Sequence, residues 1–141
     1  MSEAVREVPK KERPQFRNIN IFTDLPAYRF PLASLVSILH RISGFLMFAL
    51  LPVVLYLLEK SLLSEISFEH FKGIASHPLM KLIILALCWG YFQHFCAGVR
   101  HLIMDTHVGL DKDSARKSAA TVMVISLALT VLVALKLFGV F

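Results

Sequence analysis

The sequence predicts an all-α integral membrane protein with three transmembrane helices. The chain has 141 residues, of which 56% are hydrophobic and only 18% are charged, a balance that soluble domains rarely have. Three long runs contain no formally charged residue, at positions 42–58, 82–99 and 118–135. Because a helix needs about 20 mostly apolar residues to cross a bilayer, each run with short flanks makes one span.

Two segments follow from this pattern: a polar N-terminal arm over residues 1–30 and a three-helix membrane anchor over residues 31–141. The spans are expected at about 31–58, 79–104 and 114–138. The arm has no apolar core, so it does not resemble a cleaved signal, and its acidic residues argue against a transit peptide. We therefore expect a multi-pass protein of the bacterial cytoplasmic (inner) membrane, with a processed organellar protein as the alternative.

The distribution of lysine and arginine predicts the orientation of the chain. Six of these residues precede the first span, and the end of the second span and the loop after it carry four more. The opposite side has only Lys60, Lys72, Lys81 and Lys136. The positive-inside rule then places the N-terminus in the cytoplasm and the C-terminus outside. The net charge of +5 needs no nucleic-acid partner and adds attraction to anionic headgroups of the membrane lipid.

The first span is expected to begin near Pro31, a position where proline is tolerated. A helix over residues 31–58 is about 42 Å long, which exceeds a hydrocarbon core of about 30 Å. Its first two turns would stand among the headgroups, yet residues 30–39 are almost all apolar. This favours a docked partner protein, with helix tilt as the alternative. Pro52 is a candidate kink.

The loops and the third span carry weaker signals. Residues 67–71 have the pattern of a short amphipathic helix, and Asp113-Ser114 is expected to cap the third span. The third span has no ionisable side chain before Lys136, which favours packing and anchoring. Cys88 and Cys96 lie on one helix, cannot pair with each other, and are predicted to be small apolar fillers. No CxxCH motif supports covalent haem.

A polar cluster is expected on the first span near the cytoplasmic edge. Ser37, His40 and Arg41 are three and four residues apart and therefore share one side of the helix, and Gly44 opens space beside them. Such a group favours a polar binding pocket. The alternative is that Arg41 extends to the headgroups while the serine fills the helix.

The end of the second span reaches the same membrane level. His101 and Asp105 are four residues apart, which allows either a functional role or an interfacial ion pair that ends the helix. Arg100 beside them is either a cation available to the propionates of a haem or only a positive-inside topology signal.

His94 is the most informative residue because it lies deep in an uncharged run. An imidazole at that depth needs a partner, and ionisable residues inside spans mark function by default. Ala86, Gly90 and Gly98 lie on the same ridge at steps of four residues. The small residues either let another helix approach, with His94 as a hydrogen-bonding contact, or leave a slot for a haem whose iron His94 binds. Spacing alone leaves these two alternatives equally weighted.

Three blocks of sequence resemble the cytochrome b membrane anchor of succinate dehydrogenase, respiratory complex II. They are Arg29-Phe-Pro, Ser37-Ile-Leu-His40-Arg41-Ile-Ser-Gly44, and His94-Phe-Cys-Ala-Gly98-Val-Arg100-His101-Leu-Ile-Met-Asp105. The patterns S-x-x-H-R-x-[ST]-G and H-x-x-x-G-x-R-H-x-x-x-D, in this order on the first two spans, are specific to that family. The resemblance covers most of the chain.

The resemblance implies a role for several residues of these blocks. His94 would be an axial ligand of the iron of a b-type haem shared with a second anchor subunit, and His40 and Arg41 would lie near the haem propionates. Ser37 and Arg41 would bind ubiquinone. Asp105 matches a position near the quinone, and it and His101 would have a proton-transfer or structural role.

The resemblance also implies the partners and the overall activity. Electrons from succinate would pass through a flavoprotein subunit and an iron–sulfur subunit to quinone, with no catalytic residue on this chain and no activity by the chain alone. Two alternatives stay open from the sequence. One is the anchor of a fumarate reductase, and the other is a cofactor-free membrane scaffold or transporter subunit in which His94 only joins helices.

Overall fold

The computed structural model describes residues 20, 22–24 and 26–140, and within them it contains four α-helices and no strand. The helices are α1 (Leu32–Leu62), α2 (Glu65–Ser76), α3 (Pro78–Asp105) and α4 (Lys112–Leu137). Three of them, α1, α3 and α4, are long and apolar enough to cross a membrane. The prediction of an all-α membrane protein with three transmembrane helices is confirmed.

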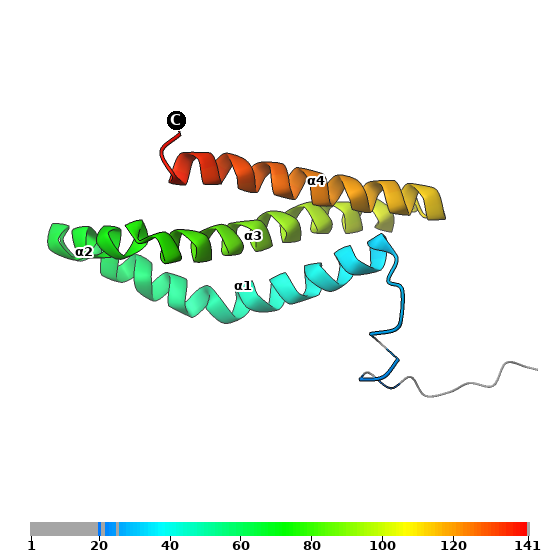
Figure 1. Ribbon diagram of the computed structural model, residues 1–141, viewed down its shortest axis with the longest axis horizontal. Helices are drawn as coiled ribbons and strands as arrows, with labels where there is room; N and C mark the ends of the chain where they lie inside the picture. Colours follow the sequence, from blue (N-terminus) through cyan, green and yellow to red (C-terminus); the bar gives the residue numbers. More distant parts are fainter. Residues whose placement is uncertain (1–19, 21, 25, 141) are drawn as a thin grey trace, which may run out of the picture.

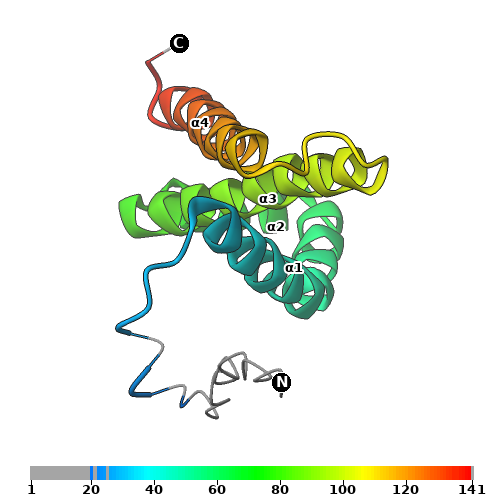
Figure 2. The same ribbon diagram turned by 90° about the vertical axis from the view of Figure 1, so that its right-hand side faces the viewer.

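The three long helices run alternately up and down, with α3 between α1 and α4 in both views (Figures 1 and 2). The beginning of α1, the end of α3 and the beginning of α4 lie at one end of the molecule, and α2 lies at the other (Figure 1). The helix ends that carry the predicted site residues of α1 and α3 are therefore neighbours in space.

The first helix is longer than expected and it is bent. It begins after Pro31, whose φ of −59° already suits a helix, and it runs to Leu62, beyond the expected end at residue 58. Pro52 lies inside it, and Figure 1 shows α1 bent midway, in the region that contains this proline. Proline removes one helical hydrogen bond and crowds the preceding turn, which accounts for a bend without an end to the helix.

Of the two predictions for the loop regions, the short helix is confirmed and the helix cap is not. The short helix predicted over residues 67–71 exists, but as part of α2, because Ser64 and Ser67 form a capping box that starts the helix earlier. The predicted cap of the third span is wrong. Asp111 caps α4, since its Oδ2 accepts a hydrogen bond of 2.9 Å from the amide of Ser114, three residues further on.

The helices meet through small side chains. Val36, Ala97, Ala119 and Val122 form the buried core, one or two from each long helix, at the end where α1 begins. Small residues let helix backbones approach closely in a membrane. Large apolar side chains point outward instead, and Phe48, in the middle of α1, is 79% exposed. This surface is built to face lipid or other subunits.

Candidate functional site at the start of α1 and the end of α3

The imidazole of His94 is fixed by α1. Its Nδ1 lies 3.0 Å from the backbone oxygen of His40 and 3.2 Å from Oγ of Ser43. A carbonyl oxygen can only accept, so Nδ1 carries the proton and donates it to this oxygen. The neutral ring then keeps a lone pair on Nε2, which is the form of histidine that binds a metal.

Gly44 provides the space for this ring. A Cβ atom at position 44 would lie 2.8 Å from Cε1 of His94, closer than non-bonded carbon atoms approach each other. The glycine of the S-x-x-H-R-x-[ST]-G block is therefore required by the His94 side chain of the neighbouring helix.

Two buried polar residues that the sequence analysis did not single out lie beside His94. Gln93 is only 1% exposed; its Nε2 donates to the backbone oxygen of Val36 at 3.2 Å, and its Oε1 lies 3.4 Å from Oγ of Ser43. Ser43 also donates back to the oxygen of Leu39 at 2.7 Å. These contacts fix the register of α1 against α3. The available signals were the amide next to His94 in an uncharged run, and the serine in the matched block.

His40 and His101 complete a group of three imidazoles. The rings of His40 and His94 are stacked, with centroids 4.1 Å apart and planes 10° apart, and His101 lies 5.1 Å from His40. His40 packs over Gly98, where an added Cβ would be in ordinary van der Waals contact, 3.5 Å from Nε2 of His40. The slot expected beside Gly98 is thus filled by His40, whereas Gly90 has open space.

Ser37 and Arg41 are near neighbours of this group along α1. Ser37 is half-buried and Arg41 is exposed. Neither side chain has a hydrogen bond or ion pair with another residue in the described part of the chain. Both therefore have their donors available for a ligand.

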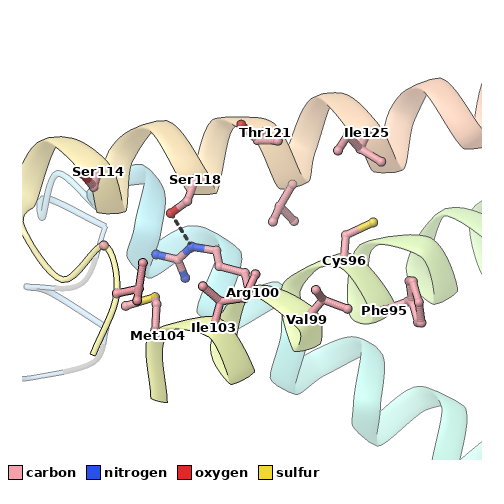
Figure 3. Close-up of a pocket in the computed structure, with 13 residues that line it drawn as sticks. Phe95, Cys96, Val99, Arg100, Ile103, Met104, Ser114, Ser118, Thr121 and Ile125 are labelled. Carbon is pink, nitrogen blue, oxygen red and sulfur yellow. Dashed lines mark hydrogen bonds between the residues drawn. The ribbon is translucent and has the colours of Figure 1, made fainter. Parts of the chain in front are cut away.

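His101 and Asp105 do not form the ion pair considered from the sequence. Asp105 is exposed, and the one ion pair found among residues 20, 22–24 and 26–140 joins Lys72 to Glu69 on α2. Arg100 is also unlike the expected surface cation, because it is 6% exposed and turned toward α4. Its Nε donates to Oγ of Ser118 at 2.9 Å (Figure 3).

Comparison with known proteins assigns most of the chain to one family. Residues 10–133 match the family model described as succinate dehydrogenase/fumarate reductase transmembrane subunit. The chain is 37% identical over 117 residues to the succinate dehydrogenase cytochrome b556 subunit of Coxiella burnetii, covering 82% of this chain and 92% of that protein.

Two other relatives carry the same name. The protein of Paracoccus denitrificans is 31% identical, with 81% of this chain and 88% of that protein covered. The protein of Rickettsia felis is 27% identical, with 94% of this chain and 98% of that protein covered. Since the family model spans most of the sequence and the first relative is matched over nearly its whole length, the chain belongs to the succinate dehydrogenase/fumarate reductase transmembrane-subunit family, among its cytochrome b membrane anchors.

Proposed function

We propose that this anchor holds a b-type haem through His94 and supplies Ser37 and Arg41 to a ubiquinone site. Membership of the family implies that the chain works in a complex with other subunits. The observation that carries the proposal is the bond from Nδ1 of His94 to the backbone oxygen of His40, 3.0 Å long. It fixes the tautomer and the direction of a histidine deep in the membrane, as a supporting hydrogen bond does for metal-binding histidines.

The residues present fit a haem. Among the described residues Nε2 of His94 has no hydrogen-bond partner, and Gly90, one turn away, leaves open space on the same ridge. When bound, the haem supplies a one-electron redox centre inside the membrane. His40 and Arg41 would bind its propionates, because they lie on the adjacent turns of α1 at the end of the bundle.

Another ligand for the haem iron would come from a second anchor subunit. The nearest other imidazole is His40, and its ring is stacked on His94 at 4.1 Å. Two rings in that arrangement leave no space between them for a macrocycle. A shared site also accounts for the large apolar side chains, such as those of Phe45 and Phe48, that α1 exposes.

The quinone role rests on available donors at the membrane edge. Reduction of ubiquinone to ubiquinol takes two electrons and two protons, and negative charge develops on its carbonyl oxygens. The hydroxyl of Ser37 would donate to one oxygen and the guanidinium of Arg41 would stabilise the charge. Asp105 is exposed at the same end, where a proton-transfer role suits its carboxylate, and His101 would have that role or a structural one.

The proposed complex contains a flavoprotein subunit and an iron–sulfur subunit in addition to the second anchor. Oxidation of succinate to fumarate releases the two electrons, and the iron–sulfur subunit delivers them at the end where α1 begins. We propose that this end faces the cytoplasm, with the N-terminus there and the C-terminus outside the bacterial inner membrane. The excess of lysine and arginine before α1 and after α3 supports this orientation.

A cofactor-free scaffold is the second candidate, because a bond from His94 to the backbone of α1 also joins two helices. The reduced-minus-oxidised spectrum of the purified complex separates the two. A b-type spectrum is expected, and His94→Ala should abolish it, whereas His70→Ala on α2, far from the site, should leave it intact. A normal spectrum in the His94→Ala complex would refute the haem assignment.

The direction of the reaction needs its own test, since the family name covers both succinate dehydrogenases and fumarate reductases. We propose succinate oxidation, because the relatives described above are named as succinate dehydrogenase subunits. Ubiquinone reduction by succinate should then be faster than fumarate reduction by a low-potential quinol in the same membranes. The opposite ratio would favour a fumarate reductase.

A further inference from the structure

A groove of about 560 Å³ runs between α3 and α4 (Figure 3). It lies on a different side of α3 from His94, whose ring is turned toward α1. Apolar side chains form most of its wall, among them Phe95, Val99 and Ile125. Nothing in the haem and quinone proposals makes use of this groove.

A buried cation lines the groove midway along its length, between Met104 on one side and Phe95 on the other. Arg100 is 6% exposed, and its guanidinium points between the two helices toward Ser118 (Figure 3). Nε donates to Oγ of Ser118 at 2.9 Å, and Nη2 donates to the oxygen of Ala115 at 3.3 Å. A guanidinium has five N–H donors, so three are left after these two bonds.

Arg100 has no counter-ion in the part of the chain that the structure describes. Its two partners are neutral oxygens. A buried charge without a counter-ion is strongly unfavourable, and more so where lipid replaces water. Arg100 is therefore expected to bind an anion. Its three remaining N–H donors suit the oxygens of a phosphate.

The depth of the groove decides which kind of anion fits. Arg100 lies five residues before the end of α3, about 7.5 Å along the axis, which is the level of the headgroups and the first methylenes. From Ser118, which contacts Arg100, to Ile125 the groove follows α4 for about 10 Å toward the membrane interior. Polar contacts at the boundary and an apolar channel below them match a phosphate with an acyl chain attached. A free anion would match only the polar contacts, and a neutral lipid would match only the apolar channel.

We infer that this groove binds an anionic phospholipid, with its phosphate at Arg100 and an acyl chain between α3 and α4. The exposed side chains of Lys112, Arg116 and Lys117, in the first turns of α4, add positive charge at the same membrane level. The inference depends on the membrane location of the helices and not on the haem or quinone proposals.

The test measures lipid binding to the complex purified in detergent and stripped of native lipid. Phosphatidylglycerol and phosphatidylcholine are added separately, and native mass spectrometry counts the lipids bound at each concentration. Phosphatidylglycerol is expected to bind the tightest site about tenfold more strongly than phosphatidylcholine, a difference of about 1.4 kcal/mol. Arg100→Gln should remove this preference, and Arg100→Lys should keep most of it because the charge stays. Lys136→Gln, which removes an exposed cation at the opposite end of α4 and away from the groove, is the matched control.

Equal binding of the two lipids, or an unchanged preference in Arg100→Gln, would overturn the inference. If Arg100→Gln does not assemble, Ile125→Trp fills the channel and leaves the guanidinium in place. Phosphatidylglycerol binding should then fall about tenfold, and unchanged binding would count against the site. A photoreactive group at position 103 should cross-link to phospholipid in native membranes. Cross-linking to another subunit instead would mean that protein covers the groove, which also overturns the inference.

Discussion

Replacing Gly44 with alanine is expected to remove haem from the complex while leaving the anchor folded. Gly44 lies on α1 against the ring of His94, where an added Cβ would be 2.8 Å from Cε1 and 3.4 Å from Nδ1. Non-bonded carbon atoms are most stable about 3.5–4.0 Å apart, so the ring must move away by about 0.7 Å or more.

This movement acts on the contact that orients His94. Its bond to the oxygen of His40 is 3.0 Å long, and an extension of about 0.7 Å takes it beyond hydrogen-bonding range. Overpacking typically costs about 1–3 kcal/mol, but alanine stabilises a helix by about 1 kcal/mol relative to glycine. The fold therefore loses little, whereas disturbing a residue that supports a metal ligand lowers metal affinity about 10–100-fold.

Haem content per complex, from the pyridine haemochrome spectrum, is the measurement. Circular dichroism and co-purification of the other subunits report whether the anchor folds and assembles. Gly73→Ala on α2 is the matched control, because a Cβ there meets nothing within 4 Å. A Gly44→Ala complex with full haem content and an unchanged b-type spectrum would refute the dependence of His94 on this contact.

Three other outcomes are expected. Ser37→Ala or Arg41→Leu should lower quinone reduction about 100-fold while succinate oxidation by a soluble dye stays normal, and equal loss of both activities would count against the quinone role. The bond from the amide of Ser114 lowers the pKa of Asp111 below its ordinary 3.8. Its contribution to stability is therefore present above that pH and is lost as the pH falls through the lower folded value. Asp111→Ala should lower the melting temperature more at pH 7 than at pH 2, and an equal loss at both would contradict this. A reporter fused after Phe141 should be active outside the cytoplasm, and cytoplasmic activity would reverse the proposed topology.

The three spans were predictable because each depends on a long uncharged run, a property of local composition alone. The need of His94 for a polar partner was also visible, since a histidine in such a run stands out. What the histidine contacts was not predictable. Nδ1 binds a backbone oxygen, and every residue has one, so no side-chain pattern could identify His40 as the acceptor.

Arg100 shows most clearly what could not be predicted from the sequence. Sequence placed it near a helix end among other cations, which is typical of a topology signal. Its burial depends on the angle at which α4 crosses α3 and on the hydroxyl of Ser118, and both are tertiary features. The cap at Asp111 was missed for a different reason. Two aspartates stand close together, and only the spacing to the free amide of Ser114 selects one of them.

The two intramembrane polar contacts also imply an order of assembly. The chain is made from its N-terminus, so α1 enters the membrane first, then α3, then α4. His94 finds its acceptor on α1, so the first two spans can close on each other as soon as α3 arrives. The hydrogen-bond partners of Arg100 are on α4, so Arg100 can form these bonds only after the last span has entered the membrane. A chain interrupted before α4 would hold the His94 contact complete, while Arg100 would lack both of its hydrogen-bond partners.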